Sequence, residues 1–341
     1  MITVGVVGYG YWGPNLVRNF GDLADVRVGA VADLEPARLA TVQRRYPWIR
    51  TVARYEEVAH DPAVDAVVVA SPASSHYEVA LASLQAGKHV LVEKPLAATS
   101  EQAARLIDEA TRRRLVLMVD HTFVYTSAVR RIKELIASDS LGDILYYDAV
   151  RTNLGLVRRD VNVLWDLAAH DLAIMDHILP RRPHTVSAVG FVHLPGTHED
   201  IAYLTLLFEN RALGHIHANW LAPVKVRRTL IGGSRRMIVY DDMEVTEKVK
   251  VYDRGTVLDE GPDDVYEKLV AFRTGDMLAP RLDVTEALHL VAEHFVECVT
   301  HGRRPLTDGE VGLRVVTILE AATQSMADQG RPVSLKVSLG A

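Results

Sequence analysis

The sequence predicts an α/β protein built from two domains. The chain has 341 residues, more than one ordinary domain of about 100–200 residues. A glycine-rich turn follows the first apolar run, and after His121 strands that alternate with helices give way to strands that follow one another. We therefore expect an amino-terminal Rossmann domain over residues 1–120 and an α+β domain with a large, mainly antiparallel sheet over residues 121–341.

In the first domain, short runs rich in β-branched residues alternate with stretches of helical period. The expected strands are residues 3–7, 26–32, 66–70, 89–92 and 116–119, and the expected helices are residues 14–20, 35–45, 76–86 and 100–113. Strands that alternate with helices form βαβ units, in which the strands run parallel. Residues 1–120 should thus form one parallel sheet covered by helices.

In the second domain, short turns such as Glu209-Asn210-Arg211 join consecutive strands, which favours antiparallel pairing. The expected helices are residues 128–138 and 164–178, and the expected strands are residues 144–153, 185–193, 202–208, 212–220, 227–231 and 237–241. We expect the helices and the segments 283–300 and 309–328 to cover one face of this sheet. The other face could pair subunits in a homo-oligomer, either a dimer or a tetramer.

Composition narrows the class of protein. The net charge of −6 and the pI near 6.2 lack the excess of basic residues that is typical of nucleic-acid-binding proteins. Apolar runs are far shorter than the ~20 residues that span a bilayer. The single cysteine, Cys298, excludes an intramolecular disulfide and fits a reducing cytosol. We expect a soluble, cytoplasmic protein with a small-molecule substrate and no nucleic-acid or membrane partner.

We expect no metal centre. His215 and His217 share one face of an expected strand, but the sequence brings no third ligand within reach of them. Zinc sites take at least three protein ligands. The two histidines are therefore interpreted as a structural pair.

The turn Gly8-Tyr9-Gly10-Tyr11-Trp12-Gly13 lies between an expected strand and an expected helix, the context that a dinucleotide-binding turn requires. Gly8 permits the tight turn, Gly10 lets the backbone approach a pyrophosphate, and Gly13 packs the helix on the strand. The helix amino terminus supplies N–H groups and a positive dipole for the phosphates. Tyr11 and Trp12 either shield the phosphate backbone or pack against the second domain.

Asp33 ends the second expected strand, twenty residues after Gly13. A carboxylate at this position can accept both ribose hydroxyls of the adenosine and repels a 2′-phosphate, so NAD is favoured over NADP. The alternative is that Asp33 caps the helix that begins at Glu35-Pro36. Arg38 lies one turn into that helix, so NADP activity stays open.

Lys94 follows the apolar run 89–92 and precedes Pro95. A residue before proline adopts extended backbone, so the ammonium can point out of the carboxyl edge of the sheet, where open α/β sheets hold their ligands. The alternative is a solvated surface lysine before a turn. In the second domain, Asp166 and His170 would be neighbours about 5–6 Å apart on one helix face, a pair suited to proton transfer or merely a surface pair.

Polar side chains with a chemistry suited to anions gather between residues 151 and 162. Arginine binds phosphate or carboxylate with a bidentate fork, so a nucleotide-sugar anion is a sensible ligand. Arg158 is the arginine that we favour as a ligand, because most surface arginines are merely solvated. The full group is Arg151, Asn153, Arg158, Arg159 and Asn162.

The order and spacing of four motifs resemble the Gfo/Idh/MocA oxidoreductase superfamily over essentially the whole chain. They are Gly8–Gly13, Ser71-Pro72 with His76, Glu93-Lys94-Pro95, and Asp166-x-x-x-His170. Residues 8–20 and 153–166 are similar, more narrowly, to bacterial nucleotide-sugar 3-dehydrogenases of the UDP-N-acetylglucosamine or UDP-N-acetylglucosaminuronate type. The stretch Asp120-His121 departs from the pattern, because relatives often have glycine before this histidine and Asn-Pro after Tyr125.

The resemblance implies a role for each matched residue. Lys94 would contact the reacting oxygen of the substrate and the cofactor ribose, and His170 would be the general acid/base with Asp166 beside it. The cationic nicotinamide would depress the pKa of Lys94. The other NAD contacts would come from Ser71, Pro72, His76, Glu93 and His121, and the substrate contacts from Asn153, Arg158, Asn162, Trp165 and His170.

The resemblance also implies an activity. The expected protein is an NAD-dependent oxidoreductase that transfers hydride between NAD and the 3-hydroxyl of a nucleotide-linked hexose, or reduces the 3-keto sugar. One alternative is a free-polyol dehydrogenase of the inositol type. The alternative from another class is a non-catalytic regulator that senses NAD(H).

Overall fold

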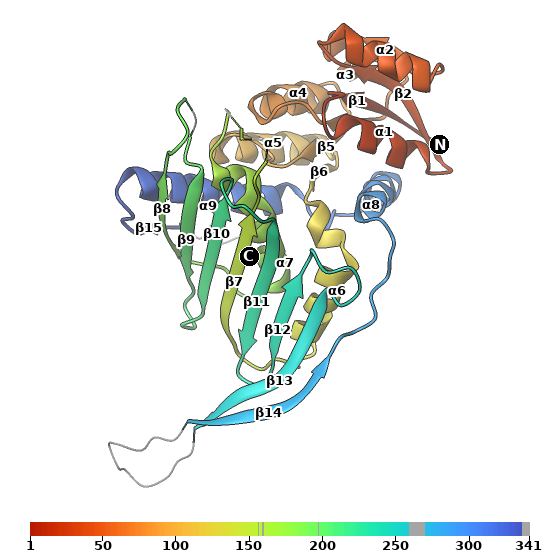
Figure 1. The fold of residues 1–341 in the computed structure, drawn as a ribbon. Coiled ribbons are helices and arrows are strands. Elements are labelled where there is room, and N and C mark those ends of the chain that lie inside the picture. The colour runs from red at the N-terminus through yellow and green to blue at the C-terminus, as the bar shows by residue number, and fades with distance from the viewer. Residues whose placement is uncertain (156, 159, 197, 259–269, 336–341) are drawn as a thin grey trace. The chain divides into compact units, whose positions relative to one another are not determined.

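The chain divides into two compact units. A computed structural model describes residues 1–155, 157–158, 160–196, 198–258 and 270–335, and the side chains of these except 255–258 and 270–274. The first unit comprises Met1–Thr126 and Thr285–Glu320, and the second comprises Ser127–Val284 and Ala321–Ala341 (Figure 1). Within the described residues, no helix combines the length and the apolar character needed to cross a membrane.

The first unit contains a six-stranded sheet in the order β3-β2-β1-β4-β5-β6, with every neighbouring pair parallel. This is the doubly wound order, with its switch point between β1 and β4. The predicted Rossmann fold is confirmed. The strands are β1 (Ile2–Val7), β2 (Val26–Ala32), β3 (Arg50–Val52), β4 (Ala66–Val69), β5 (His89–Glu93) and β6 (Leu117–Asp120).

Local sequence explains these elements. The run Ala66–Val69 is wholly buried, as expected of a central parallel strand covered on both faces. Thr99 caps α5, because its side chain accepts from the backbone N–H of Gln102. The helical segments are α1 (Gly13–Gly21), α2 (Pro36–Arg45), α3 (Glu56–Ala59), α4 (Ala73–Gln85), α5 (Ser100–Arg113) and the 3₁₀ turn η1 (Thr122–Tyr125).

The second unit contains a nine-stranded sheet in the order β14-β13-β12-β11-β7-β10-β9-β8-β15 (Figure 1). All pairs are antiparallel except β10 with β7, so the sheet is mixed and mostly antiparallel. The strands are β7 (Ile144–Thr152), β8 (Thr185–Phe191), β9 (Ile201–Leu207), β10 (Leu213–Asn219), β11 (Val226–Gly233), β12 (Met237–Asp241), β13 (Val249–Leu258), β14 (Val270–Leu278) and β15 (Val333–Ser334).

The two faces of this sheet differ in burial. In β10, Gly214, Ile216 and Ala218 are buried, whereas Leu213 and the residues that alternate with them are more exposed. The helix α7 (Ala169–Ile178) lies against the buried face, since its Asp171 carbonyl accepts from the hydroxyl of Tyr147 on β7, and α6 (Ser127–Ala137) packs on α7. The open face carries exposed apolar side chains: Val189, Phe191, Tyr203, Leu207 and Leu213.

The carboxyl-terminal helices are α8 (Ala287–His301) and α9 (Gly309–Ala327). We expected both segments to cover the second sheet, and for residues 285–320 this is wrong, because they belong to the first unit. The α8 helix packs on α1, with the rings of Phe20 and Phe295 6.1 Å apart. The backbone N–H of Val119 on β6 donates to the carbonyl of Thr307, just before α9.

Candidate dinucleotide and catalytic site

The glycine turn between β1 and α1 has the geometry of a phosphate cradle. Gly8 has a φ of +100°, and a Cβ there would lie 2.6 Å from the backbone of Ala70. A Cβ on Gly13 would lie 2.3 Å from the Gly8 carbonyl oxygen, so only glycine lets α1 approach β1 this closely. At Gly10 the nearest atom to a Cβ is 3.7 Å away, on Arg38, which leaves room for a ligand. The turn therefore fits a pyrophosphate.

The start of α1 suits an anion. Trp12 occupies the N-cap position, and its side chain makes no capping hydrogen bond to the first helical N–H groups. Such N–H groups and the helix dipole favour phosphate. Tyr11 beside it is 78% exposed and meets the Trp12 ring edge-on at 5.6 Å. The rings of Tyr11 and Trp12 thus lie together at the end of the glycine turn, beside the start of α1.

Asp33 is buried at the end of β2 and both of its carboxylate oxygens accept hydrogen bonds. Oδ2 accepts from the backbone N–H of Tyr9 at 2.6 Å, and Oδ1 accepts from the N–H of Glu35 at 2.8 Å. The second contact orders the backbone before α2, but Glu35 and not Asp33 is the N-cap residue of that helix. The Nη1 atom of Arg38 lies 3.4 Å from each carboxylate oxygen of Asp33, so a positive charge lies beside this carboxylate.

His76 joins the two loops that leave β4 and β5. It is buried, and its Nδ1 and Nε2 lie 2.7 Å and 2.9 Å from the carbonyl oxygens of Pro95 and Ser71. The peptide bond between Lys94 and Pro95 is cis. The cofactor contact of His76 stays a prediction, and what the structure shows is that His76 fixes the turn that carries Lys94.

Glu93 and Asp120 end the neighbouring strands β5 and β6 and are register partners. Both carboxyl groups are buried. Burial, followed by the charge of Asp120, raises the pKa of Glu93 well above its ordinary range, and the Lys94 ammonium opposes the shift. From the sequence, Asp120 was only a departure from the family pattern. Its position directly after the expected strand 116–119 could have indicated a site residue.

Asp166 of the second unit lies in a π-helical turn, Leu164–Ala168, that precedes α7. Asp166 and His170 therefore do not lie in one regular α-helix, because α-helix begins only at Ala169, and their adjacency on one helix face stays a prediction. Single π turns inside helices frequently occur at functional sites. Asp166 is fixed by Trp220, whose indole N–H donates to Oδ2 at 3.1 Å, a partner that the sequence did not reveal.

The arginines of the expected anion cluster separate into two roles. Arg151 is buried and forms two hydrogen bonds, of 2.7 Å and 2.9 Å, to the carboxylate of Asp171, so its role is structural. Arg158 is half exposed, and its Nε lies 3.6 Å from the Oδ1 of Asp166. Arg159 lies outside the described residues.

Three further predicted substrate contacts also have local roles. The side-chain oxygen of Asn162 accepts from the backbone N–H groups of Leu164 and Trp165, and so caps the π turn. The indole of Trp165 donates to the hydroxyl of Thr323 at 3.0 Å. The backbone N–H of Asn153 donates to the carbonyl of Asn219. The contacts of Asn162 and Trp165 position the turn that carries Asp166.

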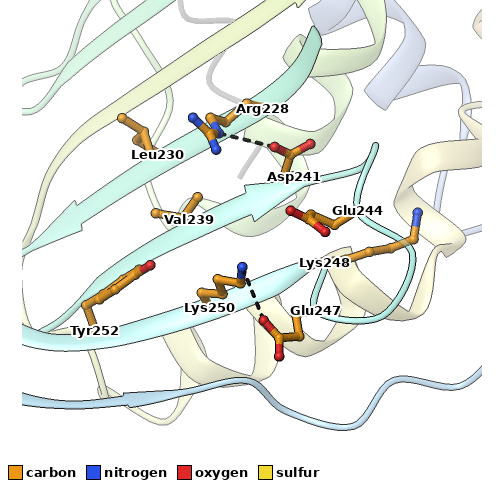
Figure 2. A pocket seen from close by; sticks show the side chains of 9 residues that line it. All are labelled: Arg228, Leu230, Val239, Asp241, Glu244, Glu247, Lys248, Lys250 and Tyr252. Atoms are coloured by element: carbon orange, nitrogen blue, oxygen red, sulfur yellow. Dashed lines mark ion pairs between the residues drawn. The ribbon is translucent and has the colours of Figure 1, made fainter. Parts of the chain in front are cut away.

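Two cavities lie away from all of these residues. One, of about 270 Å³, is on β11–β13, where Arg228 pairs with Asp241 and Lys250 with Glu247, so its charges cancel (Figure 2). The other cavity, of about 490 Å³, is lined by residues at the amino ends of β5 and β6. These ends form the edge of the parallel sheet opposite the one at which Glu93 lies. On the open face of the second sheet, the rings of His215 and His217 stack on Tyr203 at 6.2 Å and 4.5 Å.

The fold and these residues define a class. A doubly wound sheet, a glycine turn before a helix, a carboxylate at the end of β2 and a lysine at the carboxyl edge of β5 are the parts of a nicotinamide-dinucleotide-dependent oxidoreductase. The family model described as "Oxidoreductase family, NAD-binding Rossmann fold" matches residues 2–121, and the Gfo/Idh/MocA carboxyl-terminal domain model matches residues 129–239. The chain belongs to the Gfo/Idh/MocA oxidoreductase family and carries its NAD-binding domain.

Relatives of known activity are distant in sequence but similar in length. An NADP-dependent scyllo-inositol 2-dehydrogenase of Bacillus subtilis is 27% identical over 342 residues, covering 96% of this chain and 94% of the relative. A UDP-N-acetylglucosamine 3-dehydrogenase of Acidithiobacillus ferrooxidans is 27% identical over 316 residues, covering 92% and 94%. The solved structure of the latter enzyme aligns with a TM-score of 0.79 over 96% of each chain. The protein is thus an NAD(P)-dependent oxidoreductase.

Proposed function

We propose that this enzyme oxidises the 3-hydroxyl of a nucleotide-linked hexose with NAD, or reduces the corresponding 3-keto sugar. The observation that carries the proposal is Lys94, which leaves β5 at the carboxyl edge of the sheet in a turn fixed by His76. That edge is where open α/β sheets hold their ligands. The surface-lysine alternative does not account for a turn held this tightly.

The residues of the first unit fit NAD. Gly8, Gly10 and Gly13 would hold the pyrophosphate against the start of α1, and Asp33 would accept from the adenosine ribose. Asp33 favours NAD, and Arg38 beside it is the group through which NADP could also be held. Bound NAD supplies the acceptor for two electrons and one hydrogen. The remaining proposed contacts are Tyr11, Trp12, Ser71, Pro72, His76, Glu93, Lys94 and His121.

The chain's own residues would handle the proton. Oxidation of a secondary alcohol removes the C–H hydrogen with its electron pair, removes the hydroxyl proton, and leaves a ketone. We assign the hydroxyl proton to His170 as general base, oriented by Asp166, which Trp220 fixes. The Lys94 ammonium would donate a hydrogen bond to the same oxygen and stabilise the charge that develops on it.

Arg158 supports an anionic substrate. Its guanidinium is half exposed and lies beside Asp166, so it could bind a diphosphate with two parallel hydrogen bonds. The UDP-N-acetylglucosamine 3-dehydrogenase relative favours a nucleotide sugar. The inositol dehydrogenase relatives favour the free-polyol alternative. Asn153, Asn162 and Trp165 complete the proposed substrate contacts.

The assembly and compartment are also proposals. The exposed apolar side chains on the open face of the second sheet favour a homo-oligomer, a dimer or tetramer paired through that face. The single cysteine, Cys298, is buried and suits the cytoplasm. We retain residues 1–120 as the dinucleotide-binding domain and residues 121–341 as the substrate and oligomerisation domain, with residues 285–320 packed in the first unit.

A ligand panel tests the substrate class. The protein is saturated with NAD, and its melting temperature is measured with UDP-sugars, dTDP-sugars and free inositols, because a ligand stabilises by RT ln(1 + [L]/Kd). The same mixtures are followed by the absorbance of NADH. We expect stabilisation and turnover with a UDP-sugar. Turnover with inositol alone would establish the polyol alternative, and NAD binding without turnover on any substrate would establish the regulator.

A further inference from the structure

Glu93 and Asp120 place two carboxyl groups side by side. They are register partners on parallel strands, so their side chains point to the same side of the sheet from strands about 4.8 Å apart. Asp120 is 1% exposed and Glu93 is 8% exposed. Two carboxylates this close in a buried position cannot both ionise at neutral pH.

The hydrogen bonds around the two groups show where a proton would lie. Oδ1 of Asp120 accepts from the hydroxyl of Thr122 at 2.7 Å, and Oε2 of Glu93 accepts from the backbone N–H of Lys94 at 3.2 Å. Oδ2 of Asp120 is buried, and no group among the described residues donates to it. A proton on the neighbouring carboxyl group would supply the donor that this oxygen lacks.

We propose that Glu93 and Asp120 share one proton and that this carboxyl pair, carrying a single negative charge, is the positioning group for the Lys94 ammonium. The second half of this proposal rests on the proposed function, and the first half does not. Asp120 would act through Glu93 and Lys94, without touching the substrate. The raised pKa of Glu93 and the raised pKa of Asp120, both chiefly due to burial, agree with the shared proton.

Few other charged groups face the carboxyl pair. Lys94 directly follows Glu93 on the chain, and its positive charge acts to lower the pKa of Glu93. The charge of Asp120 acts to raise the pKa of Tyr125 in η1. The Tyr125 hydroxyl is hydrogen-bonded to Nδ1 of His294 in α8 at 2.9 Å. Asp308 bridges to β6 at Met118, but its charge is neutralised by Arg304. His121 directly follows Asp120 and is buried. The balance of charge at the pair is therefore set mainly by Lys94.

Titration of the carboxyl groups in the cofactor-free protein tests the shared proton without any activity. The carboxyl carbons of Asp and Glu are labelled with ¹³C, and their chemical shifts are followed by NMR across the pH range. In the wild type we expect one Glu to titrate well above its ordinary value of 4.5. In Asp120→Asn this titration should move down by about 1 unit or more, because a neighbouring charge is removed and an amide donor replaces the shared proton.

The control is Glu109→Gln, which removes a carboxyl group of the same unit that is paired with Arg112 and Arg113. It should leave the high titration in place. The shared proton is ruled out if no wild-type carboxyl titrates above its ordinary range, a result that needs no variant to fold. It is also ruled out if Asp120→Asn folds and the titration does not move.

The pH profile of kcat/KM then tests the positioning of Lys94. Above the titration of the pair, two negative charges face the ammonium in the wild type and one does so in Asp120→Asn. The alkaline limb should therefore move to lower pH in the variant, by about 1 unit. A limb that stays in place while the NMR titration moves would remove the link to Lys94. If no substrate turns over but the titration behaves as described, the proposed function fails and the shared proton stands.

Discussion

The two units of this protein assemble functional residues in different ways. In the parallel sheet, β1, β2, β4, β5 and β6 all end at one edge, so Gly8, Asp33, Ser71, Glu93 and Asp120 come from five separate strand ends. In the mostly antiparallel sheet, neighbouring strand ends point in opposite directions, and Asp166 and His170 come from one helical segment. A parallel sheet gathers a site by topology, whereas the second unit relies on a local irregularity of its helix.

The largest expected effect tests whether both units contribute to catalysis. Lys94→Ala and His170→Ala should each lower kcat by about 10²–10⁴, because each removes a group that moves or stabilises a proton. NAD affinity, measured by fluorescence titration, should persist in His170→Ala. The matched controls are Lys250→Ala and His215→Ala, which change residues on the nine-stranded sheet. Both variants should turn over substrate at the rate of the wild type. Full activity in Lys94→Ala or His170→Ala would remove that unit from the mechanism.

The next effect separates structural charge from functional charge in the second unit. Asp171→Asn should lower the free energy of unfolding by about 3–5 kcal/mol, because it leaves the buried guanidinium of Arg151 without its carboxylate. Urea unfolding followed by circular dichroism measures this. Glu101→Gln breaks an exposed pair with Arg105 and should leave the unfolding midpoint unchanged. Equal midpoints for the two variants would contradict the structural role of Arg151.

A smaller effect tests the anion contact. Arg158→Ala should raise KM for a UDP-sugar by about 10- to 100-fold, the range expected for a lost charge-assisted hydrogen bond. KM for a free polyol, if one is turned over, should not change. The control is Arg228→Ala, which removes an arginine of the nine-stranded sheet that is paired with Asp241. An equal rise for both kinds of substrate would show that Arg158 acts only by holding Asp166.

The smallest effect is a contrast in pH response between the units. Burial, and then the charge of Lys133, lowers the pKa of His177 in α7 to about 4. The unfolded chain then binds a proton that the folded one does not between pH 6.5 and 4, so stability falls as pH falls through this window. Solvent screening limits the loss to about 1–2 kcal/mol. His177→Gln should abolish it in urea unfolding at a series of pH values.

The carboxyl pair of the first unit has the opposite sign. The folded-state pKa of Glu93 is raised, so the folded chain keeps a proton that the unfolded chain loses, and stability falls as pH rises above 4.5. Glu93→Gln should remove this slope in the same experiment. If both slopes had the same sign, one of the two assignments would be wrong.

Sequence patterns predicted the parallel half more completely than the other half. The strand Val26–Ala32 and the helix Ser100–Arg113 were predicted to the residue, because β-branched runs and helical periods are local signals. The short elements β3 and α3 were missed, since three or four residues carry too little pattern. The packing of residues 285–320 in the first unit was not predicted, because the apolar period of α8 shows that a face is buried but not which partner buries it.

The site shows the same division. The glycine turn is visible because its spacing reflects backbone geometry directly. The π turn at Asp166 is not, because one additional residue per turn leaves no mark on residue composition. The pairing of Glu93 with Asp120 depends on the register between β5 and β6. The two residues are 27 positions apart in the chain, and no local sequence pattern specifies that register.

The return of residues 285–320 to the first unit has a consequence for synthesis of the protein. The Val119 backbone and the Phe20 ring have partners in Thr307 and Phe295, which the ribosome adds 188 and 275 residues later. Domains usually fold in the order in which they emerge. Here the nucleotide-binding half would wait, with the α1 face that α8 later covers left exposed, until residues 285–320 have been made. A chaperone that shields this face during translation would shorten the time in which it can aggregate.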